Sequence, residues 1–136
     1  MSIRYTTSLD GIEPEMLDGF FEGWPSPPSP ATHLAVLRGS HRCVLALDGD
    51  RVVGFITAVS DTVLTAFVPL LEVLPGHRGN GIGGELVRRM LALLDELYSI
   101  DLVCDESLVG FYATLGMTPG RAMMRRNYSR QSGSPT

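Results

Sequence analysis

Hydrophobic and polar residues follow one another along the chain in patterns that predict a mixture of short strands and helices. Residues 2–7 alternate and are rich in β-forming side chains, which predicts a first strand. Large apolar residues then recur at helical spacing, so we expect a helix over residues 13–23. A second helix is expected to begin at Ser29 and Pro30, a typical N-cap and first-turn pair, and to run to Arg38.

Two apolar runs in the middle of the chain predict a β-hairpin. Residues 43–47 and 52–59 flank a short polar turn centred on Gly49, where glycine supplies the positive φ of a tight turn. A further strand is expected over residues 62–74. It should be irregular at Pro69, because proline cannot donate a hydrogen bond to the ladder.

The second half of the chain predicts two more helices and two more β segments. The longest helix is expected over residues 82–98, where apolar side chains share one face and charged side chains the other. A short buried strand should follow at 100–104, then a helix at 108–115 and a terminal hairpin at 117–128. These elements indicate an α/β fold.

The composition fits a single domain, because 136 residues with 44% apolar and 19% charged side chains are typical of one globular unit. We expect that domain over residues 1–130 and a flexible tail over residues 131–136. No apolar run is long enough to cross a bilayer and no secretory signal is visible, so a cytoplasmic location is expected. Cys43 and Cys104 lie in apolar runs and are interpreted as reduced thiols rather than a disulfide or a metal site.

The charge pattern excludes several kinds of chemistry. Eleven basic residues against fifteen acidic ones give a net charge of −4 without a strong basic cluster, which disfavours nucleic-acid binding. Every basic side chain other than histidine is arginine, so Schiff-base chemistry and a lysine-dependent phosphate loop are excluded.

The most informative segment joins the end of a predicted strand to the start of the longest predicted helix. It holds five glycines within nine residues, Gly76, Gly79, Gly81, Gly83 and Gly84. Free backbone N–H groups at a helix N-terminus form an anion site that suits a phosphate or pyrophosphate. The glycine spacing does not fit the dinucleotide-binding fingerprint. A plain turn is the alternative, but it would not require so many glycines, each of which loses more entropy on folding than other residues.

Two motifs in this half of the chain resemble those of a known family. Val73-Leu74-Pro75 followed by Arg78-Gly79-Asn80-Gly81-Ile82-Gly83 resembles motif A of the GNAT superfamily of N-acetyltransferases, in which Val-x-Pro precedes Arg/Gln-x-x-Gly-x-Gly/Ala. Phe111-Tyr112-Ala113-Thr114-Leu115-Gly116-Met117 resembles motif B, with Met117 in place of the usual final aromatic residue. The resemblance covers nearly the whole chain, because the order of the predicted elements is also that of the family.

The resemblance implies a GNAT fold and acetyl-CoA as the cofactor. The fold would be a mixed, mostly antiparallel twisted sheet of about six to seven strands with about four helices. Strands 63–74 and 100–104 would splay apart to hold the pantetheine arm, which the backbone near Leu71 and Val73 would pair like an added strand. The amides of the loop would bind the pyrophosphate. The cofactor-binding residues implied in this way are Leu71, Val73, Arg78, Gly79, Asn80, Gly81, Ile82, Gly83, Gly84 and Tyr112.

The reaction implied is direct attack of a neutral amine on the thioester, without a metal ion. Tyr112 occupies the position from which family members donate a hydrogen bond or proton to the departing sulfur, although a purely packing role is the alternative. Glu72 is the one carboxylate in its apolar strand and is a candidate base, directly or through water. Its alternative is an outward-facing surface side chain. Asp105 stands where many members have asparagine beside the cofactor, so no role is assigned to it.

The acceptor is expected to be a small-molecule amine or a peptide. Phe20, Phe21 and Trp24 fall in the region that covers the acceptor cleft in the family, so they are the candidate substrate-binding residues, with ordinary core packing as the alternative. The acidic balance favours a cationic amine. The family also makes a homodimer an expectation. A non-catalytic module that binds acetyl-CoA and regulates a partner protein remains the alternative function.

Overall fold

The centre of the fold is a hairpin of two long antiparallel strands, β2 (Arg42–Asp48) and β3 (Arg51–Ser60), in a computed structural model that describes residues 2–134. Almost every residue of both strands is buried, as the continuous apolar runs predict. The turn between them places Gly49 at a φ of 61°, in the left-handed region that favours glycine. The predicted hairpin is therefore confirmed.

Four shorter strands complete a six-stranded sheet in the described part of the chain. They are β1 (Arg4–Thr6), β4 (Thr65–Val68), β5 (Leu71–Val73) and β6 (Ser99–Leu102). The main order is β1-β2-β3-β4-β6, and β5 also pairs with β3. Only the contact between β4 and β6 is parallel, so the prediction of a mixed, mostly antiparallel sheet is confirmed.

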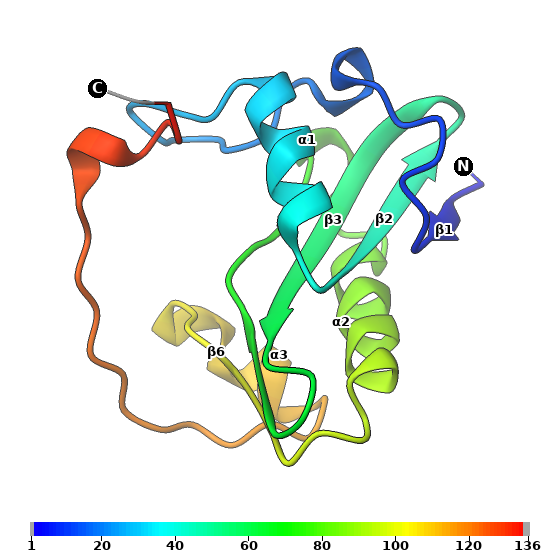
Figure 1. Ribbon diagram of the computed structural model, residues 1–136. Coiled ribbons are helices and arrows are strands. Elements are labelled where there is room, and N and C mark those ends of the chain that lie inside the picture. Colours follow the sequence, from blue (N-terminus) through cyan, green and yellow to red (C-terminus); the bar gives the residue numbers. More distant parts are fainter. Residues whose placement is uncertain (1, 135–136) are drawn as a thin grey trace.

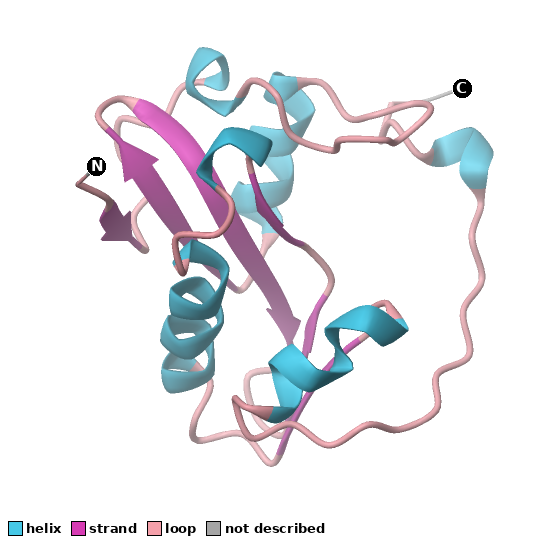
Figure 2. Cartoon of the chain, turned by 180° about the vertical axis from the view of Figure 1, so that it is seen from behind, coloured by secondary structure: helices cyan, strands magenta, loops and turns pink. Residues whose placement is uncertain are grey.

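The two longest helices pack on opposite faces of β3. A Cβ built on Gly54 would lie 3.1 Å from Leu86 and 3.2 Å from Ile82, so this glycine lets α2 (Ile82–Leu93) approach one face closely. Because successive residues of a strand point to opposite faces, Phe55 points the other way, where its ring meets His33 of α1 (Pro30–Gly39). The two views agree on this arrangement, with α1 in front of the strands in Figure 1 and behind them in Figure 2.

The helix predicted over residues 13–23 is wrong in extent. Only a 3-10 helix, η1 (Pro14–Leu17), forms there. Gly19, Phe21 and Gly23 all have positive φ values, of 94°, 63° and 81°, which interrupt helical geometry at every second residue. The apolar residues in this segment are buried through a series of turns rather than along a helical stripe.

The C-terminal half also departs from the prediction. Helix α2 ends at Leu93 rather than 98, and the helix expected at 108–115 is shortened to η3 (Glu106–Leu108) and α3 (Val109–Ala113). The hairpin predicted over 117–128 is wrong, because that segment has no strand and reaches only η4 (Tyr128–Arg130). The described residues contain three α-helices rather than about four.

Further observations bear on the remaining expectations. Cys43 is buried and Cys104 partly buried, and both are free thiols. Within residues 2–134, no helix is both long and apolar enough to span a bilayer. The tail predicted from residue 131 is described as far as Ser134, and residues 135–136 lie outside the described part. Gln131 accepts a hydrogen bond from the Ser26 backbone N–H at 2.9 Å, which ties this end to the segment before α1.

Candidate functional site

The strand predicted over 62–74 is divided at Pro69, as its missing donor predicts, and the division opens the sheet. Strand β4 pairs with β6 as far as Val68 and Leu102, after which β5 continues on β3 alone. The two chain segments therefore diverge beyond Val68 and Leu102. The parallel pairing thus ends where the resemblance predicts that the two strands splay apart.

The backbone of β5 faces this opening at alternate residues. The N–H of Leu74 donates to Val53 O at 2.8 Å, and the N–H of Thr57 donates to Leu70 O at 3.0 Å. Because alternate residues of a strand bond the same neighbour, the N–H and C=O groups of Leu71 and Val73 point away from β3. These are the two residues whose backbone groups the family resemblance assigns to the pantetheine arm.

The glycine-rich loop follows β5 and leads into α2. It contains the short η2 (Pro75–His77), and Gly79 and Gly81 then adopt φ values of 82° and 78°. Gly81 is the N-cap of α2, and no side chain caps the helix. The first N–H groups of a helix have no intrahelical acceptor, so those of Ile82, Gly83 and Gly84 are placed to receive an anion.

Glycine at position 83 is not explained by the conformation of the protein. Its φ is not in the left-handed region, and a Cβ there would make only ordinary contact, 3.8 Å from a methyl group of Val73. Within a helical first turn, alanine is favoured over glycine. A glycine in this place is consistent with the close approach of a ligand to the backbone.

The loop and the two motif segments border one hollow of about 250 Å³. The residues that line it come from β5, the loop, the first turn of α2 and α3: Val73, His77, Arg78, Gly79, Gly81, Ile82, Gly83, Gly84 and Phe111. Motif A and motif B, far apart in sequence, therefore meet at one place. His77 belongs to this lining; its Nε2 lies 3.1 Å from Asp48 Oδ2, and its Nδ1 is buried without a hydrogen-bond partner.

Three of the predicted cofactor residues, Leu71, Asn80 and Tyr112, do not line the hollow. Asn80 instead folds its side chain back on the loop, where Nδ2 donates to His77 O at 3.2 Å and to Arg78 O at 3.4 Å. Leu71 lies farther along β5, two residues before Val73. The side chain of Asn80 therefore stabilises the loop's shape, while its backbone remains part of the loop.

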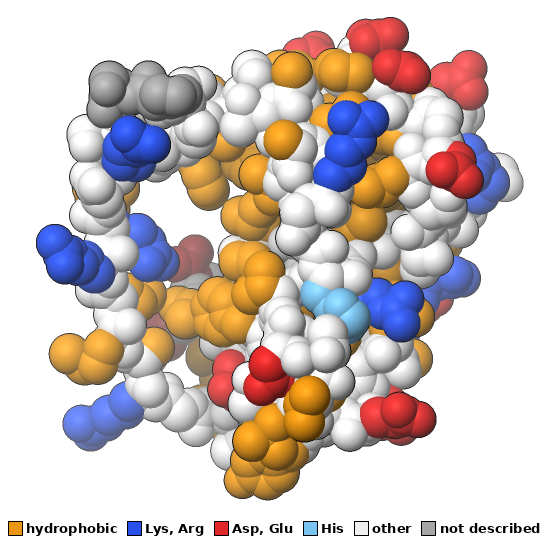
Figure 3. All heavy atoms as spheres, in the orientation of Figure 1, with side chains coloured by type: hydrophobic (Ala, Val, Ile, Leu, Met, Phe, Trp, Pro, Cys, Tyr) orange, Lys and Arg blue, Asp and Glu red, His pale blue; other side chains and the backbone are white. Residues whose placement is uncertain are grey.

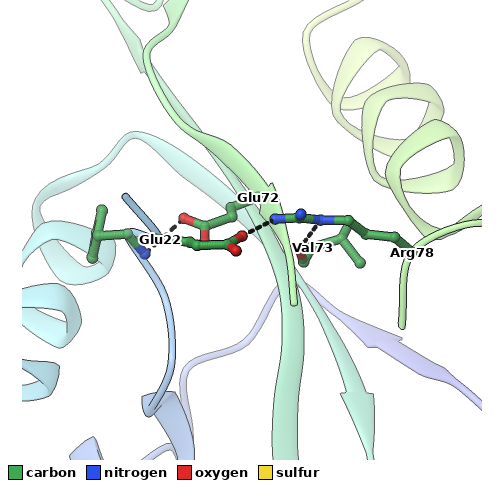
Figure 4. A network of polar contacts seen from close by, with 5 residues as sticks. Glu22, Glu72, Val73 and Arg78 are labelled. Carbon is green, nitrogen blue, oxygen red and sulfur yellow. Dashed lines mark hydrogen bonds and ion pairs between the residues drawn. The ribbon is translucent and has the colours of Figure 1, made fainter. Parts of the chain in front are cut away.

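Arg78 connects the loop to two other segments (Figure 4). Its Nε donates to Val73 O at 3.0 Å, and its guanidinium lies 2.7 Å from a carboxylate oxygen of Glu22. Both side chains of this ion pair are about half exposed, at 52% and 53%, so it contributes little to stability. Its effect is positional, since it links the glycine loop to the segment before α1. The Val73 carbonyl keeps a second lone pair for another donor.

Glu72 lies on the face of the sheet that carries the aromatic cluster, because it pairs with Phe55. Its carboxylate accepts hydrogen bonds from the backbone N–H groups of Phe21 at 2.8 Å and Glu22 at 3.3 Å. The sequence alone could not assign this face. The structure thus places Glu72 beneath the turn at residues 20–24, rather than on an outward surface.

The predicted acceptor residues form two environments. Phe20 and Phe21 are buried, at 8% and 4% exposure, and pack against His33 and Phe55, whereas Trp24 is 38% exposed. The Phe21 and Trp24 rings lie 4.9 Å apart. The positive φ of Phe21 is unusual for a bulky residue, and strained backbone of this kind concentrates at functional sites. The hydrogen bond to Glu72 and the packing of the Phe21 ring hold the turn in this conformation.

Tyr112 lies on α3 beside the hollow, next to Phe111, with the two rings 4.9 Å apart. It is largely buried. Burial, with a smaller electrostatic contribution from Cys104, raises the pKa of the Tyr112 phenol. The phenol therefore stays protonated at neutral pH and can donate a hydrogen bond. The backbone carbonyl of Tyr112 also anchors the end of α3 by accepting from Leu115 and Met117.

Sequence analysis did not identify two residues of this region, Glu22 and His33. Glu22 meets Arg78 across 56 positions of sequence, a contact that no short motif signals. His33 is 1% exposed within the aromatic cluster, and burial lowers its pKa to about 4. The apolar pattern of α1 could have indicated that His33 is a core residue. It could not have indicated that the His33 ring contacts Phe21.

Comparisons with known proteins agree with this architecture. The profile of the Acetyltransferase (GNAT) family matches residues 9–117. A crystal structure of a candidate acetyltransferase from Deinococcus radiodurans R1 shares 46% identity over 98% of this chain and 94% of its own, with a TM-score of 0.94. A GNAT-family acetyltransferase from Streptococcus pneumoniae TIGR4 shares 30% identity over 93% and 98% of the two chains, with a TM-score of 0.68.

A more distant structure shows the fold alone. An aminoglycoside acetyltransferase from an uncultured soil metagenomic sample is 20% identical over 93% of this chain and 99% of its own, with a TM-score of 0.68. No curated protein matches the chain in sequence. The family profile spans both motifs that meet at the hollow, and the Deinococcus structure extends the likeness over almost the full length. The chain belongs to the GNAT family of acetyltransferases.

Proposed function

We propose that the protein is an N-acetyltransferase that moves the acetyl group of acetyl-CoA to a primary amine. The observation that carries this proposal is the convergence of three features on one hollow. These are the open backbone edge of β5, the uncapped start of α2 after the glycine loop, and Phe111 from α3.

The residues present fit acetyl-CoA. The N–H groups of Ile82, Gly83 and Gly84 suit the pyrophosphate, and the missing Cβ at Gly83 leaves room for it. The outward backbone of Leu71 and Val73 suits the amides of the pantetheine arm, which would add to β5 as a strand does. When bound, acetyl-CoA supplies an acetyl group activated as a thioester.

The reaction also requires that one proton leaves the amine and that one is donated to the departing sulfur. An alkyl amine has a pKa of about 10.4, so neutralising it at pH 7 costs about 4.6 kcal/mol. Glu72, directly or through water, is the proposed base because it is the carboxylate of β5 that faces the turn at residues 20–24. The Tyr112 phenol, kept protonated by burial, is the proposed donor to the leaving sulfur.

The acceptor is proposed to bind beside that turn. Trp24 provides an exposed aromatic surface there, packed on Phe21, and Glu22 provides a half-exposed carboxylate that already pairs with Arg78 through one oxygen. An aromatic face next to a carboxylate suits a cationic amine. The aminoglycoside acetyltransferase of the same fold acts on an acceptor of this chemical kind.

The experiment that tests the proposal measures release of CoA thiol from acetyl-CoA with a panel of polyamines, aminoglycosides and lysine peptides. Calorimetry measures acetyl-CoA affinity on the same protein. We expect saturable acetyl-CoA binding and release that depends on one class of amine. Binding without release for any amine would favour a regulatory acetyl-CoA-binding module, whereas no binding would contradict the proposed site.

A further inference from the structure

The turn at residues 20–24 is held from two sides, by side chains that come from two different segments (Figure 4). From β5, the Glu72 carboxylate accepts hydrogen bonds from the backbone N–H groups of Phe21 at 2.8 Å and Glu22 at 3.3 Å. From the glycine loop, the Arg78 guanidinium lies 2.7 Å from a carboxylate oxygen of Glu22. The first contact fixes the backbone of the turn, and the second fixes the charged side chain that the turn carries.

The two residues of the ion pair belong to two different proposed binding sites. Arg78 lines the hollow beside the glycine loop, where the pyrophosphate of acetyl-CoA is proposed to bind. Glu22 lies between Phe21 and Trp24 in the turn beside which the acceptor amine is proposed to bind. The ion pair between Glu22 and Arg78 therefore connects the cofactor site directly to the acceptor site.

Each charge of this pair is one that a ligand would use. Arginine binds phosphate oxygens through two parallel hydrogen bonds, which is why it is common at phosphate sites. Figure 3 shows hydrophobic side chains gathered on the face that carries α1, which is also the face on which Glu72 lies. A cationic amine that binds on such a face needs a carboxylate that is not already occupied, because an unpaired charge on an apolar surface costs free energy.

The ion pair is weak enough to be exchanged for another one. Its side chains are 52% and 53% exposed, and ion pairs of this kind contribute little to stability. A pyrophosphate carries more negative charge than one carboxylate, and the N–H groups at the start of α2 would bring it beside Arg78. We therefore expect a bound pyrophosphate to take the guanidinium from Glu22.

The exchange requires the movement of one side chain. Arg78 both lines the hollow and contacts Glu22, so its guanidinium lies between the two sites that compete for it. Its Nε donates to Val73 O at 3.0 Å, which keeps the side chain against β5 (Figure 4). The hydrogen bonds from Phe21 and Glu22 to Glu72 do not involve Arg78, so the turn keeps its backbone conformation when the ion pair opens.

We propose that Arg78 is a positioning residue that keeps Glu22 occupied until acetyl-CoA binds. The pyrophosphate then takes the Arg78 guanidinium, and the released Glu22 carboxylate receives a cationic group of the acceptor. Because binding linkage is reciprocal, each ligand strengthens the binding of the other by the same factor. This inference rests on the cofactor and acceptor sites proposed above, and it adds the coupling between them.

Calorimetric titration with CoA, which has no acetyl group to transfer, tests the competition without turnover. Glu22→Gln keeps the shape of the side chain and removes the competing charge, so CoA should bind about three- to fivefold more tightly, a change of up to about 1 kcal/mol. In an Arg78→Met background, Glu22→Gln should not tighten CoA binding. An ion pair that merely stabilises the loop gives the opposite sign, because its loss would weaken CoA binding.

Asp48→Asn is the matched control for the loss of a negative charge near the loop. Asp48 contacts the same loop, but its ion pair is with His77 rather than with Arg78. Its effect on CoA affinity measures long-range electrostatics alone and should be smaller than that of Glu22→Gln. Equal tightening by the two substitutions would overturn the proposal. Tightening by Glu22→Gln that persists without Arg78 would overturn it as well.

Fluorescence of Trp24, the single tryptophan, provides a second test. Adenosine diphosphate carries a pyrophosphate but no pantetheine arm, so its effect on Trp24 must pass through the protein. Saturation with adenosine diphosphate should change the emission of the wild type, because Glu22 lies two residues from Trp24 and loses its partner. The emission of Arg78→Met and Glu22→Gln should not change. An unchanged wild type, or the same change in all three proteins, would contradict the release of Glu22.

The failure of this inference can be distinguished from the failure of the proposed function. If the wild type does not bind CoA, the proposed cofactor site is wrong and the coupling is overturned with it. If CoA binds and Glu22→Gln leaves its affinity unchanged or weaker, the cofactor site stands and the coupling alone is overturned.

Discussion

Acid should destabilise this protein in part through His33, which is 1% exposed and has no hydrogen-bond partner on either ring nitrogen. Its ring lies 5.3 Å from Phe20, 4.9 Å from Phe21 and 4.3 Å from Phe55, centroid to centroid. Burial among these rings lowers its pKa to about 4, against 6.5 for an accessible histidine. The difference of about 2.5 pH units corresponds to about 3 kcal/mol.

Acid destabilises the protein through His33 because the unfolded state binds the proton more readily than the folded state. The unfolded chain protonates His33 below pH 6.5, whereas the folded chain keeps it neutral until about pH 4. Stability is therefore complete above pH 6.5 and is lost as the pH falls through this interval, with no further loss from His33 below it. At pH 5 the loss from this group is about 2 kcal/mol.

The assay is urea unfolding between pH 8 and pH 4, followed by far-UV circular dichroism and by fluorescence of Trp24, the single tryptophan. His33→Leu removes the titrating group and keeps an apolar side chain of similar size. The free energy of unfolding should fall less steeply with acid in this variant, by about 2 kcal/mol at pH 5. His41→Leu, at an exposed position, is the matched control. Equal pH dependence in wild type and His33→Leu would refute the reasoning.

Two further predictions concern catalysis. Tyr112→Phe should lower kcat by roughly 10²-fold with little change in the KM for acetyl-CoA, because the lost hydrogen bond acts on the leaving sulfur; steady-state kinetics with unchanged kcat would count against this role. Glu72→Gln removes the proposed base, so it should lower kcat and change the pH profile of the reaction. Because Glu72 also accepts hydrogen bonds from the N–H groups of Phe21 and Glu22, a rise confined to the KM for the acceptor would instead limit its role to holding the turn.

The sequence predicts well those parts of the fold that depend on the backbone preferences of single residues. Gly49 needs a positive φ, Pro69 cannot donate to a ladder, and Gly81 precedes a long amphipathic run. Each of these marks a real turn, break or helix start. The position of the proposed cofactor site follows from them, because the end of a buried strand and the start of the next helix must meet at the loop between them.

The failures come from interactions that are distant in sequence. Apolar spacing over residues 13–23 cannot reveal that Glu72, about fifty positions later, accepts hydrogen bonds from Phe21 and Glu22 and stabilises a turn. The sequence also could not show on which face of the sheet the Glu72 side chain lies. The division at Pro69 breaks the alternation of side chains from which a face is assigned. The face became clear only from the pairing of Glu72 with Phe55.

The hairpin expected at 117–128 failed for a related reason. Pro119-Gly120 is a good local turn signal, but a hairpin also needs two strands that pair within the chain. Residues 118–127 instead pass, without a strand, from Met117 to Gln131, which is bonded to Ser26 before α1. Sequence patterns report the tendency of a segment to turn or extend, and they do not report whether it finds a strand to pair with.

The most direct test of the central claim is acetyl-CoA titration of Gly83→Ala by calorimetry, beside thermal unfolding of the same variant. Alanine fits position 83 without a clash and favours a helix by up to about 1 kcal/mol, so stability should be unchanged or higher. Its methyl group would nevertheless occupy the anion site, and acetyl-CoA affinity should fall at least about tenfold. Gly76→Ala, on the same loop but outside the lining of the hollow, should bind as the wild type does. Wild-type affinity in Gly83→Ala would contradict a cofactor site at the start of α2.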